Sequence, residues 1–329
     1  MPTVEHAMLC EFIAHGSNWV SGATLAAKLG VSPTVVRRQL AKIQAQGLVI
    51  ETRRALGYRL VSQPPGPHAA LIESQLRIRP RSFSLLVFDE TDSTNDEAVR
   101  QLAAGRTTPF AVIAGCQKRG RGRLGRAWHS ATNGNLYLSL AFRPRVPPGR
   151  MAAFTLWMGL NLCELLAKFA QVAPGLKWPN DILLDGRKAG GILTEARVDA
   201  DQIRDLIFGL GLNINGPTGG WPAELAQRAV SLAEIASRPL DFNRLTAAII
   251  GRMLLAYEDF ADGTYTRTFA DLWHRYDVLR GRRIALLEGG RRHQGTVIGL
   301  DDEGALMLRP SHGRTRRFHA GEVTLEKKE

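Results

Sequence analysis

Cysteine is scarce in this chain of 329 residues, which contains only Cys10, Cys116 and Cys163. The number is odd, and the spacings do not match the paired patterns of zinc sites. Small secreted domains that are held together by disulfides carry far more cysteine. We therefore expect neither disulfides nor structural zinc, and we predict that each cysteine is a small core residue.

Long hydrophobic runs are missing as well. The longest uncharged apolar stretch, 151–163, holds 13 residues, whereas a membrane-spanning helix needs about 20. The N-terminus lacks the basic region followed by an apolar region that marks a secretory signal. We expect a cytoplasmic protein with no membrane association.

Acidic residues are fewer than basic ones. The chain has 31 Asp and Glu but 43 Lys and Arg, which gives a net charge of +12 and a pI near 10.2. Such an excess suits polyanionic partners, namely DNA, nucleotides or acidic proteins, without choosing among them. Hydrophobic residues make up 44% of the chain, which is enough to fill the two or three domain cores expected at this length.

The first segment, 1–63, has the pattern of a winged helix-turn-helix domain. Apolar residues at helical spacing predict three short helices. Gly30 ends the second helix, Ser32 is placed to cap the third, and Pro33 suits its first position. The alternating stretch that follows predicts two strands around a turn that contains Gly57.

Cations of this domain lie where a winged helix meets DNA. On the third helix and the wing they can neutralise phosphates or reach guanine edges in a major groove. The residues that we expect to contact DNA are Ser32, Thr34, Arg37, Arg38, Lys42, Arg53 and Arg54. The alternative is a winged helix that serves dimerisation or protein contact, with its cations solvated.

Three further segments follow. The stretch 64–82 is rich in proline and predicts a linker with one short helix. In 83–276, strands mingle with helices and hairpins, which favours an α+β domain with a mixed sheet and helices on one side. From 277 to 329, short strands separated by glycine-containing turns predict a small β-barrel.

One loop between two predicted strands, "QKRGRGRLGRAWHS" (117–130), is unusually cationic. Its charges are spaced by glycines that let backbone N–H groups approach a ligand closely. Guanidinium groups match carboxylate and phosphate oxygens in pairs. We expect these cations to repel one another unless an anion lies among them, and the alternative is a solvated charged surface. They are Lys118, Arg119, Arg121, Arg123 and Arg126.

This loop and four other motifs resemble the biotin–protein ligase family. The others are "DSTNDEA" (92–98), "GNLYLS" (134–139), "KWPNDI" (177–182) and "RKAGGILTE" (187–195). Together with the winged helix they resemble the bifunctional branch, in which the ligase is also the biotin-operon repressor, so the resemblance covers essentially the whole chain. Arg37 and Arg38 stand where an aromatic residue and a lysine are frequent in the family, which leaves the operator sequence open.

The resemblance implies a class II-synthetase-like ligase domain in the centre and an SH3-like β-barrel at the C-terminus. It implies that ATP and biotin, with Mg²⁺, form biotinyl-5'-AMP, and that biotin then passes to a lysine of a biotin carboxyl carrier protein. It also implies a homodimer that binds operator DNA when the adenylate is bound.

The resemblance carries residue roles onto matching positions. Arg123, Lys188 and Asp181 would be catalytic. Asn180 and Asp181 would hold Mg²⁺, although Asp181 can instead serve the incoming amine. Biotin would contact Ser93, Thr94, Asn95, Gln117, Gly120, Arg121, Arg123 and Lys188. ATP or the adenylate would contact Arg123, Arg126, Trp128, Lys177, Asn180, Lys188, Asn213 and Trp221.

Several of these positions have plainer interpretations. Lys188 follows a turn and can be a solvated lysine, and most tryptophans fill cores. Of the two tryptophans, we expect Trp221 to be the ligand contact. At the level of the whole chain, the alternatives are a lipoate-type acyl ligase of related fold and a biotin-sensing transcription factor without catalysis. The full run "RGRGRLGRAW" speaks against the first, and Asn180 and Asp181 beside Lys188 speak against the second.

Overall fold

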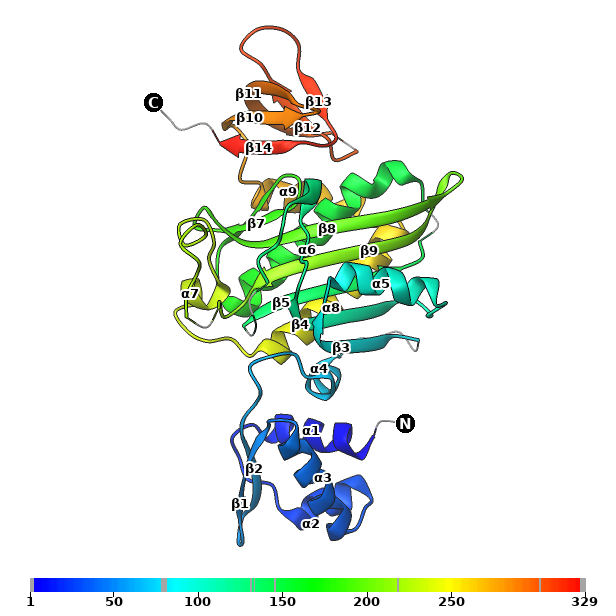
Figure 1. Ribbon diagram of the computed structural model, residues 1–329, viewed down its shortest axis with the longest axis vertical. Helices are drawn as coiled ribbons and strands as arrows, with labels where there is room; N and C mark the ends of the chain where they lie inside the picture. Colours follow the sequence, from blue (N-terminus) through cyan, green and yellow to red (C-terminus); the bar gives the residue numbers. More distant parts are fainter. Residues whose placement is uncertain are drawn as a thin grey trace.

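The computed structural model describes residues 3–77, 82–130, 132, 134–144, 146–217, 219–301 and 303–325. An N-terminal helical region, a central sheet with helices and a small C-terminal sheet follow one another along the long axis of the molecule (Figure 1). This is the α+β arrangement that the sequence predicts, while the boundaries at residues 63, 82 and 276 stay predictions. In the described part of the chain, no helix has the length and apolar character required to cross a membrane.

The N-terminal region is a winged helix with a core of its own. Gly30 ends the second helix in the left-handed conformation at φ 63°, and the Ser32 hydroxyl accepts a hydrogen bond from the Val35 backbone N–H at the start of the third. Met8, Leu25 and Leu40 are buried together. The elements are α1 (Val4–His15), α2 (Gly22–Leu29), α3 (Pro33–Ala45), β1 (Val49–Arg53) and β2 (Gly57–Ser62).

The predicted linker contains the short helix α4 (Ala69–Gln75), which packs on both sides. Leu71 is buried in the winged-helix core, whereas Ile72 belongs to the core of the central region. The His68 backbone N–H donates to Asn243 Oδ1 at 2.9 Å. This helix therefore ties the two regions together (Figure 1).

A seven-stranded mixed sheet forms the central region, in the order β3-β4-β5-β9-β8-β7-β6. β3 and β4 are parallel, and the other neighbours are antiparallel. Asp185 and Gly186 turn the chain between β7 and β8 with φ of 48° and 76°, so the predicted hairpin is present. The strands are β3 (Ser84–Thr91), β4 (Phe110–Gln117), β5 (Asn135–Phe142), β6 (Pro174–Lys177), β7 (Asp181–Leu184), β8 (Arg187–Asp199) and β9 (Gln202–Asn213).

Helices cover both faces of this sheet, so the prediction of helices on one side was wrong. Along β4, Phe110 and Val112 pack beneath α5 (Thr94–Ala103), while Ala111 and Ile113 join the larger core on the other face. Successive side chains of a strand point to opposite faces of the sheet. A strand that is apolar at every position therefore has an apolar layer on each face. The other helices are α6 (Met151–Ala170), α7 (Leu232–Ala236), α8 (Phe242–Ala261) and α9 (Thr266–Tyr276), with 3₁₀ turns at Arg123–Gly125 and Pro148–Arg150.

Five antiparallel strands make the C-terminal region, in the order β13-β12-β11-β10-β14. Ile284 and Val297 of this sheet belong to the same buried cluster as the central core, and the Trp178 indole N–H donates to the Gly304 carbonyl at 3.2 Å. The small sheet is thereby fixed against the central one. Its strands are β10 (Arg283–Glu288), β11 (Arg291–Leu300), β12 (Leu306–Arg309), β13 (Arg316–Phe318) and β14 (Glu322–Leu325).

Candidate active site

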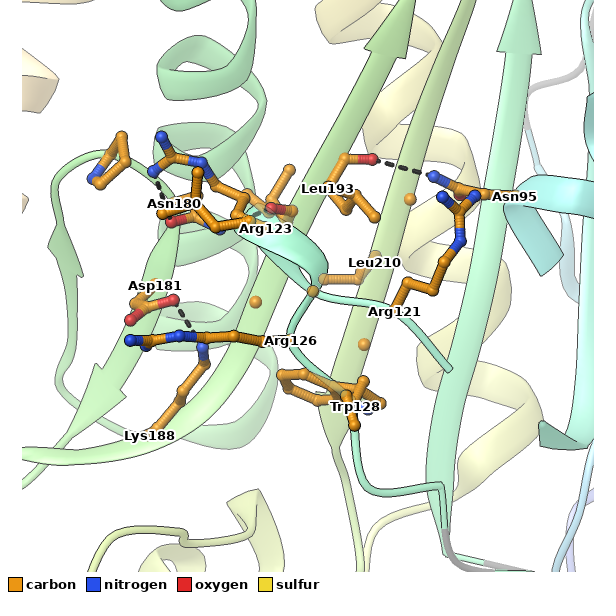
Figure 2. A pocket seen from close by; sticks show the side chains of 18 of the residues that line it. Asn95, Arg121, Arg123, Arg126, Trp128, Asn180, Asp181, Lys188, Leu193 and Leu210 are labelled. Atoms are coloured by element: carbon orange, nitrogen blue, oxygen red, sulfur yellow. Dashed lines mark hydrogen bonds and ion pairs between the residues drawn. The ribbon is translucent and has the colours of Figure 1, made fainter. Parts of the chain in front are cut away.

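One cavity collects most of the residues to which the sequence analysis gave a ligand role. It lies over β8 and β9, between the start of α5, the cationic loop and the segment 177–181, and β14 closes one side (Figure 2). The expected residues that line it are Ser93, Thr94, Asn95, Gln117, Arg121, Arg123, Arg126, Trp128, Lys177, Asn180, Asp181 and Lys188.

Three expected residues do not line this cavity. Gly120 packs against Ser130 outside the lining, where a Cβ would lie only 2.6 Å from Ser130 Oγ. Asn213 donates to the carbonyls of Lys188 and Val230 at 3.3 and 3.0 Å and so holds the backbone of β8. Trp221 borders a separate hollow. The structure thus brings Trp128 to the cavity, and not Trp221.

The polar end of the cavity is built by the parallel pair β3 and β4. Their register sets Thr91 opposite Gln117, so the start of α5 lies beside the end of β4. Gln117 Oε1 accepts from the Thr94 backbone N–H at 2.9 Å and lies 3.2 Å from Thr94 Oγ1. Ser93, Thr94 and Asn95 are each at most 4% exposed. This end therefore offers buried hydroxyl and amide groups to a small polar ring.

Cations of the loop are largely paired with carboxylates of the protein. Lys118 lies 2.7 Å from Glu90, Arg121 contacts Asp96 and Glu195 at 2.5 and 3.1 Å, and Arg126 pairs with Glu322. The Glu90 hydrogen bond raises the pKa of Lys118. The expectation that these charges repel one another without an external anion was therefore wrong for three of the five.

Arg123 differs from those three. Its Nη1 lies 3.4 Å from Asn180 Oδ1 and 3.5 Å from the Gly321 carbonyl, and no carboxylate among the described residues pairs with it. Burial lowers the pKa of its guanidinium, while Asp181 and Glu322 act in the opposite direction. A partly buried cation with only neutral partners is a favourable place for a carboxylate or a phosphate.

Two lysines and one carboxylate complete the charged end. The β7–β8 hairpin brings Lys188 Nζ within 2.6 Å of Asp181 Oδ1 and within 5.3 Å of the Trp128 ring centroid. Lys177 lines the same cavity. Burial lowers the pKa of its ammonium group, and the charge of Asp181 acts in the opposite direction. With Arg123, Arg126 and Glu322 included, this end carries four cations and two anions. The remaining positive charge suits a polyphosphate.

Glycines on the central strands make room for side chains from other elements. A Cβ at Gly209 would lie 2.3 Å from Asn95 Oδ1, and one at Gly211 would lie 2.5 Å from the Trp128 ring. At Gly191 the Trp128 ring would be 3.0 Å away. The glycines of "GLGLNIN" and "AGG" thus let Asn95 and Trp128 approach the sheet closely.

Sequence reasoning missed two sets of residues. Gly321 and Glu322 reach the cavity from β14, and nothing in the local sequence of the C-terminal region signals this. Asn135 stands in "GNLYLS" but was given no role. It is 2% exposed and lies behind the residues that line the cavity. Its side-chain amide contacts the Tyr137 hydroxyl but makes no hydrogen bond of good geometry among the described residues. A buried amide at the first position of a strand was the signal that could have identified it.

The expected DNA-contacting residues lie on α3 and the wing. Thr34, Arg37, Arg38, Lys42 and Arg54 are exposed, and none of these cations has an ion-pair partner in the described part of the chain. Ser32 caps α3. Arg53 pairs with Glu51 at 3.1 Å and lies over the Trp19 ring. The free cations of α3 thus remain available to phosphates.

Comparison with known proteins agrees with this geometry. Residues 87–213 match the biotin/lipoate A/B protein ligase family, residues 5–59 match a helix-turn-helix domain, and residues 280–325 match the biotin protein ligase C-terminal domain. The bifunctional ligase/repressor BirA of Bacillus spizizenii is 29% identical over 95% of this chain and 96% of its own. The biotin–[acetyl-CoA-carboxylase] ligase of Mycobacterium tuberculosis is 31% identical over 72% of this chain and 87% of its own.

A solved structure is similar as well. The biotin protein ligase from Aquifex aeolicus in complex with biotin and ATP superposes with a TM-score of 0.63 at 27% identity, covering 74% of this chain and 99% of that one. With the catalytic match, the helix-turn-helix match and the full-length relatives in agreement, the chain belongs to the biotin–protein ligase family, in its bifunctional ligase/repressor branch.

Proposed function

We propose that this protein is an ATP-dependent biotin–protein ligase that also represses biotin-synthesis genes through its winged helix. It forms biotinyl-5'-AMP and transfers biotin to a lysine of a biotin carboxyl carrier protein. The observation that carries the proposal is the cavity with two unlike ends: buried hydroxyl and amide groups at Thr94 and Gln117, and the cations Arg123, Lys177 and Lys188 at the other.

The first reaction needs alignment and charge neutralisation more than a base. A carboxylate is already ionised near pH 7, so the biotin carboxylate can attack the α-phosphate once the mutual repulsion of the two anions is offset. Lys188 is placed to act on the phosphate, with Asp181 orienting its ammonium at 2.6 Å. Arg123 has no carboxylate partner among the described residues, and it is assigned to the carboxylate and phosphate oxygens.

The adenine ring has a complement in Asn135. An asparagine amide pairs with the donor and acceptor edge of adenine. The buried amide of Asn135 contacts Tyr137 but makes no hydrogen bond of good geometry among the described residues. It stands opposite Asn213 in the β5–β9 register, two residue pairs beyond Gly211, where Trp128 lies. The Trp128 indole N–H is also buried and has no hydrogen-bond partner in the described part of the chain, so both residues are assigned to the nucleotide.

Magnesium fits this site as an ion that arrives with the nucleotide. Mg²⁺ usually takes one or two protein carboxylates together with substrate phosphates and water, and it would neutralise phosphate charge. Asp181 supplies one carboxylate, and Asn180 Oδ1 is a second oxygen, 3.4 Å from Arg123 Nη1. Asn180 Nδ2 donates to the Ile192 carbonyl at 2.7 Å, which turns that oxygen toward the cavity.

A lipoate-type ligase is the alternative within the same family, whose model covers both activities. The dithiolane ring of lipoate offers no N–H or carbonyl group, whereas the ureido ring of biotin offers both. The polar groups around Thr94 and Gln117 already bond to one another. They would gain no further partner from a dithiolane, whereas each hydrogen bond to a ureido ring adds about 0.5–1.5 kcal/mol. Biotin is therefore the favoured substrate.

The test is incubation with ATP, Mg²⁺ and a carrier domain, with labelled biotin in one set and labelled lipoate in the other. Biotin is expected on the carrier lysine, and lipoate is not. Label from lipoate alone, or binding of biotin without any transfer, would contradict the ligase assignment. Repression is tested by binding to the DNA upstream of biotin-synthesis genes, which should tighten when biotin and ATP are both present, and sedimentation under the same conditions should report a dimer.

A further inference from the structure

Glu195, on β8, holds one end of a row of hydrogen bonds that ends at Thr94 inside the cavity. The carboxylate itself does not line the cavity. It accepts from Asn95 Nδ2 at 2.6 Å, and it pairs with Arg121 at 3.1 Å. Figure 2 shows Asn95 and Arg121 together at this end of the cavity. From Asn95 the row continues through Ser139, which is fully buried on β5.

The orientation of the Asn95 amide follows from its partners. A carboxylate paired with arginine can only accept, and so can a backbone carbonyl. Asn95 therefore turns its NH₂ group to Glu195 and to the Leu193 carbonyl, which is 3.2 Å away. Its Oδ1 then faces Ser139 Oγ at 2.6 Å. The missing Cβ of Gly209 makes this position possible, since that atom would lie 2.3 Å from Asn95 Oδ1.

The direction of the next two hydrogen bonds follows from counting protons. The Ser139 hydroxyl has one proton, and Asn95 Oδ1 has none to give, so Ser139 donates to Asn95. Ser139 Oγ is also placed to donate to Thr94 Oγ1 at 2.8 Å, so the two oxygens compete for its proton, and the shorter contact favours Asn95. The Thr94 hydroxyl itself donates to Gln117 Oε1 at 3.2 Å. Gln117 Oε1 also accepts a hydrogen bond from the Thr94 backbone N–H at 2.9 Å. The Thr94 hydroxyl thus meets the cavity with a lone pair.

We propose that Glu195 is a positioning residue that sets the hydrogen-bond polarity of the biotin pocket. Through Asn95 it keeps the Ser139 proton away from Thr94 Oγ1. The Thr94 hydroxyl, whose own proton faces Gln117, then meets the cavity as an acceptor and selects a ring that presents an N–H group at that point. This inference rests on the proposed function, because the ureido ring of biotin is the donor that it invokes. It adds a specificity role for a carboxylate that never touches the ligand.

A second role of Glu195 must be separated from this one. Glu195 also anchors Arg121, so its loss can act through the cationic loop. Asp96 anchors the same guanidinium at 2.5 Å and makes no hydrogen bond to the Asn95 side chain among the described residues. Asp96→Asn is therefore the matched control, since it weakens the Arg121 anchor and leaves the row from Glu195 to Thr94 intact.

Titration calorimetry of the full-length protein with biotin, and with cyclic carbamate analogues in which one or the other ureido N–H is replaced by oxygen, tests the proposal. The wild-type protein should prefer biotin to at least one carbamate by about ten-fold, the worth of one buried hydrogen bond. Glu195→Gln should bind biotin about ten-fold more weakly and lose most of that preference, with kcat near normal. Asp96→Asn should keep the preference, and Glu195→Asp should restore part of it.

An unchanged preference in Glu195→Gln, or an equal loss in Asp96→Asn, would overturn the proposal. If Glu195→Gln does not fold, Asn95→Ala decides, because it frees the Ser139 proton for Thr94 Oγ1 without removing a charge and should lose the same preference. Failure of the proposed function gives a different result, since the wild-type protein would then not bind biotin at all.

Discussion

The Lys188 ammonium lies 2.6 Å from the Asp181 carboxylate, although the two residues project from different strands of the β7–β8 hairpin. The pairing holds a flexible side chain at the charged end of the cavity (Figure 2). Lysine on its own samples many rotamers, so a fixed ammonium reduces the entropy lost when the phosphate arrives.

Lys188→Ala should slow adenylate formation. Loss of a cation that assists attack at the α-phosphate costs about 2–4 kcal/mol of transition-state stabilisation, which is about 30-fold to 1,000-fold in rate. The measurement is biotin-dependent pyrophosphate release. Arg187→Ala is the matched control, because the neighbouring Arg187 pairs with Glu234 at 2.7 Å and does not line the cavity. Wild-type release by Lys188→Ala would remove Lys188 from the catalytic residues.

Arg123→Gly should form the adenylate but fail to retain it. Arg123 is the loop cation inside the cavity that lacks a carboxylate partner among the described residues, so a bound anion depends on it most. Released biotinyl-adenylate, a reactive mixed anhydride, would label lysines of a bystander protein. Arg119→Gly, an exposed position outside the cavity, should not cause such labelling. Slow pyrophosphate release without bystander labelling by Arg123→Gly would contradict the retention role.

Arg37→Ala combined with Arg38→Ala should weaken DNA binding and leave biotinylation near normal. Both side chains are exposed on α3, and each phosphate contact adds about 0.9 to the slope of log K against log salt concentration. On a mixed-sequence duplex, the slope should therefore fall by about 2. The charge-matched control is Arg197→Ala with Arg204→Ala, on the β8–β9 hairpin of the central region. Equal losses in both double variants would show that net charge, and not position, governs binding.

Stability should fall on acidification through His68. Burial lowers the pKa of this imidazole from about 6.5, opposed by the charge of Glu5, and its Nδ1 accepts from the Leu71 backbone N–H at the start of α4. Because the unfolded chain binds the proton more readily, stability is fully present above about pH 6.5 and is lost as pH falls through the folded pKa.

The measurement for His68 is the melting temperature of the wild-type protein and of His68→Asn from about pH 7.5 to about pH 5. Asparagine is a good helix cap and does not titrate, so this variant should lose less stability over that range. Parallel curves for the two proteins would show that His68 does not control this loss.

Local sequence determined the elements whose signals lie within a few residues. Gly30, Ser32 and Pro33 predict where one helix ends and the next begins, because left-handed backbone, a capping hydroxyl and a fixed φ are properties of single residues. Asp185 and Gly186 predict the hairpin that carries Lys188 for the same reason. The motifs also identified most of the cavity lining, since each lies at the end of one strand or the start of one helix.

Tertiary structure decided which charges meet and which rings lie in the cavity. Glu322 reaches Arg126 from 196 positions away, and Glu195 reaches Arg121 from 74, so no local pattern can predict that the loop is neutralised by the protein itself. Trp128 occupies the cavity because Gly211 and Gly191, on neighbouring strands, leave space for its ring, while Trp221 borders another hollow. These pairings depend on strand order and register, which are set by the packing of the whole core and not by any one segment.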